Sequence, residues 1–164
     1  MRSKFLSKNF YISFSIVTLI YFLDRLTKIY VIQLDKNNLG SDIFNSAYLN
    51  IVLIWNKGIA FGLFSFNESH LYNILSLIIS IIVVILVIMS LKSHGFKRYS
   101  LLMIVGGAVG NLHDRIFFNA VPDFIDFHVG NFHWFIFNVS DIFITLGVIS
   151  MIIFELLNKE NEDR

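Results

Sequence analysis

The fold is decided by residues 71–91, which read LYNILSLIISIIVVILVIMSL. This stretch carries no charge over about 20 positions, the length that an α-helix needs to cross about 30 Å of hydrocarbon. It therefore predicts a helix that spans a membrane. The whole chain of 164 residues fits that solvent, because 55% of its residues are hydrophobic, only 15% are charged and its mean hydropathy is +0.68.

Three further membrane spans are predicted, at about residues 10–31, 99–115 and 139–157. The first follows a basic N-terminus and resembles a cleavable secretory signal. No small-x-small cleavage site follows it, so we expect this span to be retained. The sequence thus predicts a mostly α membrane protein, with four transmembrane helices in a single integral membrane domain over residues 1–164.

Basic residues predict the orientation, because Lys and Arg near the ends of spans are retained in the cytoplasm. They are Arg2, Lys4 and Lys8 at the N-terminus, and Lys92, Lys97 and Arg98 between the second and third spans. Both termini are therefore expected in the cytoplasm, and residues 33–70 and 116–138 on the outer side. Membrane lipids are the expected surroundings. A net charge of +1 does not indicate binding to nucleic acid.

The two outer segments are expected to fold differently. In the first, residues 48–55 are rich in aromatic and branched side chains, and Asn56-Lys57-Gly58 forms a turn before another apolar run at 59–66. This pattern predicts two strands joined by a turn, and hence a small extracytoplasmic β-structure. The second, residues 117–137, contains the single proline, and we expect a structured loop at the membrane surface.

Several kinds of catalytic centre are excluded by residue type. The chain has no cysteine, so thiolate nucleophiles, disulfides and cysteine metal sites are all absent. The histidines are His70, His94, His113, His128 and His133. None shows the i, i+4 pairing beside a glutamate that a zinc peptidase needs, so no metal site is expected.

Carboxylates in or beside the membrane indicate function, because an ionisable group there is costly. Asp123 lies between hydrophobic neighbours in VPDFID. Asn138 can cap the N-terminus of the last span, so Asp141 would lie in the first turn of that helix, near the positive end of the helix dipole. Two carboxylates in different environments can activate water and polarise an amide carbonyl. Asp123 and Asp141 are therefore a candidate catalytic pair, and taken singly they fit two unrelated interface aspartates equally well.

Other charged residues have simpler interpretations. Asp24 and Lys28 are spaced i, i+4, which fits a hydrated ion pair at the outer end of the first span, and a role in shaping a site is the alternative. Glu155 lies where the last span emerges and is interpreted as solvated.

The third span ends in a polar group that needs more than one interpretation. Gly106 and Gly110 are spaced for close contact between helices. Asn111, Asp114 and Arg115 follow, and they fit either a fixed hydrogen-bond network or a clamp on substrate carbonyls.

Taken together, five blocks of sequence resemble the lipoprotein signal peptidase family, also called type II or prolipoprotein signal peptidases. They are LDRLTK (23–28), NKGIAFG (56–62), GNLHDR (110–115), VPDFID (121–126) and FNVSD (137–141). The resemblance implies an aspartic endopeptidase that cuts diacylglyceryl-modified prolipoproteins before the lipidated cysteine and uses no metal or organic cofactor. It also implies a bacterial cytoplasmic (inner) membrane, an active site near the periplasmic face, and the antibiotic globomycin as an inhibitor.

Carried over by position, Asp123 and Asp141 match the catalytic dyad. The residues that match substrate-binding or site-shaping positions are Asn56, Gly58, Asn111, Arg115, Asn138, Asp24 and Lys28. The loop before Asn138 matches a mobile lid over the substrate, and this lid is expected to be a surface loop or a helix. Ser140 stands where alanine is usual, so its hydroxyl is expected to alter the hydrogen bonding of Asp141.

Two other functions fit the sequence less well. In a small proton-coupled transporter, the aspartates would form a relay across the membrane, but all of them lie towards the predicted outer side. A structural partner protein of a larger complex would leave the buried aspartates unexplained.

Overall fold

The computed structural model describes residues 2–38, 43–58 and 69–162. Its elements are α1 (Arg2–Asn37), β1 (Phe44–Asn45), β2 (Leu49–Asn56), α2 (Ser69–Lys92), α3 (Gly95–Phe118), β3 (Val121–Val129), β4 (Phe132–Phe137) and α4 (Val139–Glu162). Within the described residues, four helices are long and apolar enough to cross a membrane. The prediction of a mostly α protein with four spans and a small sheet is confirmed.

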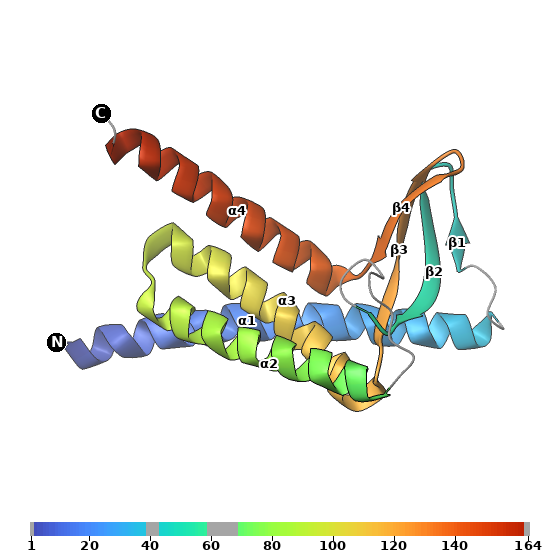
Figure 1. Ribbon diagram of the computed structural model, residues 1–164, viewed down its shortest axis with the longest axis horizontal. Coiled ribbons are helices and arrows are strands. Elements are labelled where there is room, and N and C mark those ends of the chain that lie inside the picture. Colours follow the sequence, from blue (N-terminus) through green and yellow to red (C-terminus); the bar gives the residue numbers. More distant parts are fainter. Residues whose placement is uncertain (1, 39–42, 59–68, 163–164) are drawn as a thin grey trace.

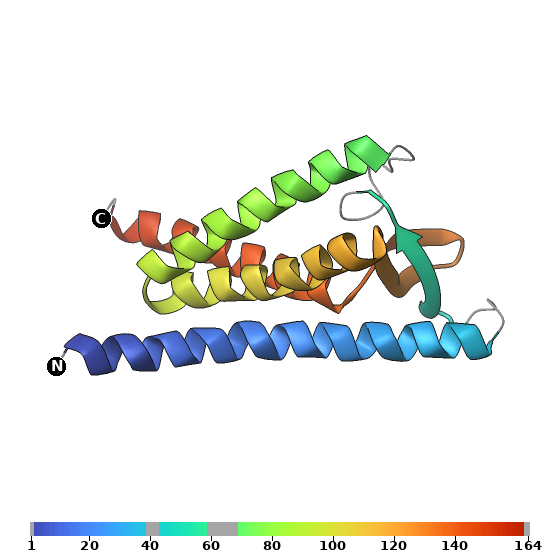
Figure 2. The same cartoon turned by 90° about the horizontal axis from the view of Figure 1, so that it is seen from below.

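The helices run side by side, with both chain termini at one end and the sheet at the other (Figure 1). Helix α3 is the centre of the bundle, and Figure 2 shows α1 and α2 on opposite sides of it. In α3, 56% of the membrane-spanning stretch is buried, compared with 22%, 17% and 17% in α1, α2 and α4. The polar end of α3 is therefore enclosed by the other helices.

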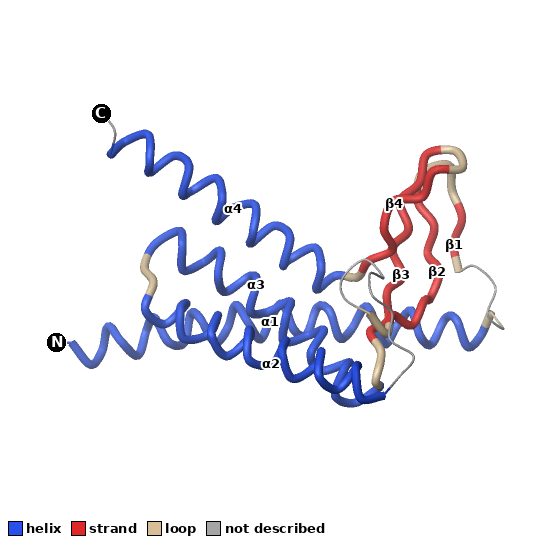
Figure 3. Tube along the Cα trace, in the orientation of Figure 1, coloured by secondary structure: helices blue, strands red, loops and turns tan. Residues whose placement is uncertain are grey.

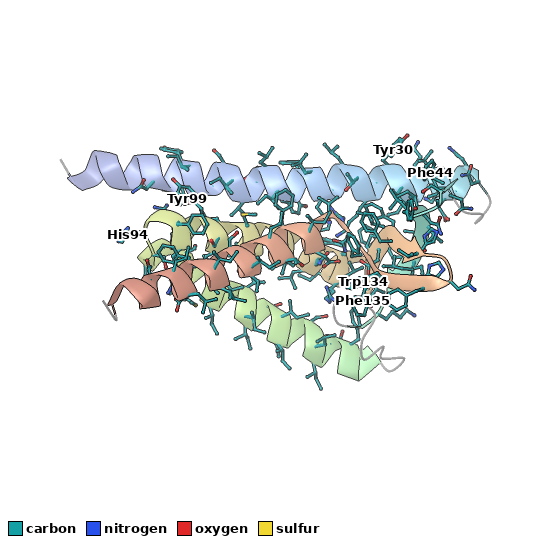
Figure 4. All side chains as sticks on the ribbon, turned by 90° about the horizontal axis from the view of Figure 1, so that it is seen from above. Tyr30, Phe44, His94, Tyr99, Trp134 and Phe135 are labelled. Carbon is teal, nitrogen blue, oxygen red and sulfur yellow. The ribbon has the colours of Figure 1, made fainter. Side chains whose placement is uncertain are left out.

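The outer faces of the helices are suited to lipid. Large apolar side chains such as Ile78, Ile81 and Ile85 on α2 are exposed, which would be costly in water and is normal against acyl chains. Exposed aromatic side chains lie at both ends of the bundle, as expected at membrane interfaces. In Figure 4, Tyr99 lies at the end that holds the termini, and Tyr30, Phe44, Trp134 and Phe135 lie at the end that holds the sheet.

Glycines let α3 approach its neighbours closely. A Cβ atom at Gly107 would lie 2.4 Å from the backbone oxygen of Ser140, and one at Gly110 would lie 2.3 Å from Ser140 Oγ and 2.7 Å from Asp24 Oδ2. One at Gly106 would lie 2.9 Å from Ile20 Cβ. The predicted close packing at Gly106 and Gly110 is confirmed, and it brings α1 and the start of α4 against the polar end of α3.

In the described parts of the chain, the sheet has four antiparallel strands in the order β1-β2-β3-β4 (Figure 3). Strand β2 confirms the strand expected at 48–55, whereas its expected partner at 59–66 lies outside the described residues. The structured loop expected at 117–137 is wrong, because β3 and β4 form a hairpin there. Its two-residue turn begins at Gly130, whose φ of 58° suits glycine.

Candidate active site

Asp123 and Asp141 reach one cavity from two different elements. Asp123 is the third residue of β3, and Asp141 lies in the first turn of α4. Both are buried, with 3% and 7% of their surfaces exposed. They line a cavity of about 210 Å³, together with Asn56, Ile79, Ala108, Asn111, Arg115, Val121, Asn138, Ile144 and Thr145.

Two side-chain amides hold the Asp123 carboxylate. Asn56 Nδ2 donates to Asp123 Oδ2 at 2.8 Å, and Asn138 Nδ2 donates to Oδ1 at 2.6 Å. The pairing of β2 with β3 shifts register between Ile51 and Ile54, immediately before Ile54 pairs with Asp123. Such irregularities change the direction of side chains beside functional sites. Here Asn56, two residues further along β2, reaches the carboxylate.

Asp141 is held by the helix start that it helps to build. Asn138 Oδ1 accepts from the Asp141 backbone N–H at 3.1 Å, and Asp141 Oδ2 accepts from the Asn138 backbone N–H at 3.2 Å. This reciprocal arrangement is a capping box, which confirms the predicted cap. Asn111 Nδ2 donates to Asp141 Oδ1 at 2.8 Å. The single side chain of Asn138 thus bonds to both aspartates and sets their relative position.

The environment of Asp123 favours its protonated form. Burial, followed by the negative charge of Asp141, raises the pKa of Asp123 from 3.8 to about 6. The amide hydrogen bonds from Asn56 and Asn138 lower the pKa and offset part of this effect. Asp123 therefore keeps its proton at a pH where an ordinary aspartate is ionised.

Arg115 connects α3 to the turn that follows β2. Its Nη2 donates to the Gly58 backbone oxygen at 2.9 Å, and its Nη1 donates to the Asn111 backbone oxygen at 3.3 Å. The Gly58 N–H in turn donates to Asn56 Oδ1 at 2.7 Å. This chain of contacts orients the Asn56 amide, so that its Nδ2 points to Asp123.

The Asp24–Lys28 pair is deeply buried, so the interpretation as a hydrated ion pair is wrong. Both side chains have 0% exposure, as does that of Asp114. Lys28 Nζ donates to Asp24 Oδ2 at 2.8 Å and to Asp114 Oδ2 at 2.7 Å. Arg25 forms an ion pair with Asp114 as well, so two cations balance two carboxylates. The close approach of α1 to α3 removes the water that the spacing alone would have allowed.

This buried network extends to the dyad. Lys28 Nζ also donates to Asn111 Oδ1 at 2.9 Å, which leaves the Asn111 Nδ2 group to face Asp141. Asp24 Oδ1 accepts from the Ser140 backbone N–H at 3.0 Å. The network therefore fixes both the partner of Asp141 and the first turn of α4. Of the two interpretations of the polar end of α3, the fixed hydrogen-bond network describes Asn111 and Asp114.

Ser140 does not act as expected. Its side chain is completely buried, and its Oγ has no hydrogen-bond partner among the residues described. It packs where α3 comes closest, since a Cβ atom at Gly110 would lie 2.3 Å from this oxygen. The backbone of Ser140, rather than its hydroxyl, contributes to the site.

Several features of the site do not follow from the sequence. They are the pairing of Arg25 with Asp114 and the part of the cavity wall formed by Ile79, Ala108, Val121, Ile144 and Thr145. Thr145 could have been found, because it lies four residues after Asp141 on the same face of a helix. None of the described residues that line the cavity is a histidine.

The chain is similar in sequence to known proteins. A family model described as Signal peptidase (SPase) II matches residues 16–157. The lipoprotein signal peptidase of Pelagibacter ubique (strain HTCC1062) is 46% identical over 159 residues, which cover 96% of each chain. That of Anaplasma phagocytophilum (strain HZ) is 43% identical over 137 residues, which cover 82% of this chain and 85% of that protein.

The fold is also similar to solved structures. A bacterial membrane enzyme with 29% sequence identity superposes with a TM-score of 0.73 and covers 91% of this chain and 90% of its own. A second has 30% identity and a TM-score of 0.71. Four apolar helices and these relatives describe a multi-pass bacterial membrane protein. Because the family model spans residues 16–157 and two relatives are 46% and 43% identical, this chain is a peptidase that belongs to the signal peptidase II family.

Proposed function

We propose that this protein is an aspartic endopeptidase that removes the signal peptide from diacylglyceryl-modified prolipoproteins by cutting before the lipidated cysteine. The observation that carries the proposal is that two buried aspartates, Asp123 and Asp141, are both hydrogen-bonded to Asn138 and line one cavity. Membership of the signal peptidase II family supplies the substrate class. The chemistry needs no metal or organic cofactor.

In this mechanism the two aspartates have different tasks. Asp141 acts as the carboxylate base, because it lies at the N-terminus of α4, where the helix dipole favours negative charge. Asp123 supplies the proton, because burial raises its pKa to about 6. Asp141 takes a proton from water as the water attacks the scissile carbonyl, and Asp123 protonates the carbonyl oxygen. Collapse of the tetrahedral intermediate then releases the amine with a proton from the dyad.

The residues around the dyad fix its geometry and the substrate backbone. Asn56 and Asn138 hold Asp123, and Asn111 holds Asp141. Arg115 lines the same cavity, and any of its N–H groups left free by Gly58 and Asn111 can bind substrate carbonyls. We assign Asp24 and Lys28 a positioning role, exerted through Ser140 and Asn111.

An apolar hollow beside the dyad suits a lipid-modified substrate. It measures about 280 Å³, includes Asp141, and is otherwise lined by Trp134, Phe137, Ile142, Thr145 and Leu146. A diacylglyceryl group in this hollow would bring the adjacent peptide bond to Asp141 without leaving the bilayer. Confinement of substrate and catalyst to one depth of the membrane then supplies part of the rate enhancement.

The same arrangement supports an orientation in the bacterial cytoplasmic (inner) membrane. The termini lie at the end of the bundle opposite the sheet (Figure 1). With Lys92, Lys97 and Arg98 retained in the cytoplasm, both termini are cytoplasmic and the dyad faces the periplasm. A peptide antibiotic such as globomycin would compete with substrate at this face.

The test is cleavage of a fluorogenic diacylated lipopeptide by purified protein in detergent. Asp123→Asn and Asp141→Asn should each abolish turnover and leave the protein folded, as judged by gel filtration and thermal unfolding. Glu155→Gln is the matched control, because this exposed carboxylate forms its ion pair with Lys97 at the other end of the bundle. Substantial turnover by either dyad variant would remove that aspartate from the mechanism.

A further inference from the structure

A second group of ligand-type side chains lies on the hairpin, away from the dyad. Asp126 and His128 are on β3, and His133 is on β4. One ligand atom from each lies within 4.8 Å of the others. His133 Nδ1 lies 2.9 Å from Asp126 Oδ2, and the rings of His128 and His133 stack with centroids 5.0 Å apart. We call these three residues the outer cluster.

Strand pairing explains why the outer cluster forms. Residues 126 and 128 are two apart on β3, so their side chains share one face of the strand. His128 pairs directly with His133, whereas Asp126 pairs with Ile136, so β4 carries one extra residue in this interval. The shift in register lets His133 reach both residues of β3. The three side chains meet through the hairpin itself and do not depend on the position of a helix.

Two polar groups of the outer cluster form few or only long hydrogen bonds with the described residues around them. Asp126 is only 4% exposed, and among the described residues its carboxylate accepts one long hydrogen bond besides its contact with His133, from Asn50 Nδ2 at 3.4 Å. His128 Nδ1 is buried and has no hydrogen-bond partner among the described residues. Buried nitrogen atoms without partners are uncommon. No hydrogen bond to this nitrogen fixes the His128 ring, so it can turn to place a nitrogen on a ligand.

We propose that the outer cluster binds one divalent transition-metal ion of the Zn²⁺ class. Two imidazoles and one carboxylate form a zinc ligand set with a fourth position left for water. Ligand atoms within 4.8 Å of one another need only small side-chain rotations to reach bonds of about 2.0–2.2 Å. The half-exposed His133 gives the ion access from solvent. The bound ion would join β3 to β4, and it would do so whether or not the dyad is catalytic.

Zinc binding is tested on the full chain in detergent, with any histidine tag removed and metal stripped by a chelator. Titration calorimetry with ZnCl₂ should give one ion per chain, and MgCl₂ should give no saturable heat. Zn²⁺ should raise the Tm, because it binds only the folded hairpin. It should also slow hydrogen exchange of the amides in residues 126–136, a readout that does not depend on activity.

Three variants distinguish Zn²⁺ binding at the outer cluster from Zn²⁺ binding elsewhere on the protein. His133→Gln and His128→Gln should each weaken Zn²⁺ affinity by at least tenfold, since even changes outside the ligand set cost about 10–100-fold. His133 is half exposed, so its variant should fold normally. His94→Gln is the matched control, because His94 is exposed beside α3 at the other end of the bundle, and it should bind like wild type.

Absence of saturable Zn²⁺ binding to the wild type would overturn the proposal and leave His133 and Asp126 as a simple ion pair. Unchanged affinity in both the His128→Gln and His133→Gln variants would overturn it too. Binding that is lost in the Asp123→Asn, Asp141→Asn double variant and kept in the histidine variants would place the ion at the dyad instead.

Discussion

The pKa of Asp123 reports directly on its neighbours. Asp141→Asn removes the negative charge that raises this pKa, so Asp123 should titrate below its present value of about 6. Asn56→Leu removes a hydrogen bond to the carboxylate, so Asp123 should titrate above that value. Carboxyl ¹³C resonances of labelled protein in micelles, followed between about pH 3 and pH 9, measure both shifts. Equal titration in the two variants would contradict the proposed coupling.

The same shift predicts how stability depends on pH. The folded state raises the pKa of Asp123 from 3.8 to about 6, so it disfavours the ionised form. The stabilisation from this group is therefore complete below pH 3.8 and is lost as the pH rises through about 6. Asp123→Asn cannot ionise and should lose this part of the pH dependence of unfolding.

Lys28 tests the buried network. Lys28→Met leaves the buried acids Asp24 and Asp114 with too little positive charge, and breaking a buried pair typically costs about 3–5 kcal/mol. We expect a lower free energy of unfolding in mixed micelles and a lower kcat, because the Asn111 amide loses its anchor. The Lys28→Met, Asp24→Asn double variant should recover part of the stability.

The matched control for Lys28 is Lys97→Met. Lys97 also pairs with a carboxylate, Glu155, but both side chains are exposed, so this variant should unfold almost like the wild type. Equal losses for Lys28→Met and Lys97→Met would show that the buried network does not contribute to stability.

Single residues were predictable where their chemistry is local. Aspartates among apolar neighbours and the Asn138 cap follow from the sequence, and the structure places Asp123 and Asp141 together at one cavity. The burial of Lys28 was not predictable, because it depends on how closely α1 approaches α3. Spacing within one helix contains no information about the water that a second helix excludes.

At the scale of elements, Gly110 is the contact that joins three helices. Gly110→Ala would place a Cβ atom 2.7 Å from Asp24 Oδ2 and against Ser140, so α3 must move away from α1 and α4. We expect a lower Tm together with a loss of turnover, because Asn111 would move away from Asp141.

Gly106→Ala provides the comparison on the same face of α3. The atoms nearest to its added Cβ atom would all belong to the apolar side chain of Ile20, the first at 2.9 Å. It should lower the Tm and leave most of the turnover intact. Equal turnover in the two glycine variants would show that the dyad tolerates separation of the helices.

The helices could be predicted and the strand pairing could not. Continuous apolar runs identify α1, α2 and α4, because span length follows from bilayer thickness. Besides β1, strand β2 pairs with β3, which lies more than sixty residues further along the chain, and no local pattern predicts so distant a pair. The hairpin of β3 and β4 was missed because the buried start of β3 lacks the alternation of polar and apolar residues that marks a half-exposed strand.

At the scale of the whole molecule, orientation can be tested with single cysteines, because the chain has none of its own. Asn131→Cys, in the hairpin turn, should react with a membrane-impermeant maleimide added to spheroplasts. His94→Cys, between α2 and α3, should react only after the membrane is made permeable. Labelling in the reverse order would place the dyad on the cytoplasmic face.

The carboxamide of Asn138 makes the two acids chemically unequal. One end of an amide donates and the other accepts, and here the donating end meets Asp123 while the accepting end caps α4. Turning the group over would present an oxygen to an oxygen and uncap the helix, a loss of about 1 kcal/mol from the cap alone. In the proposed mechanism, the orientation of this one side chain therefore gives the two aspartates different hydrogen-bond partners before any substrate binds.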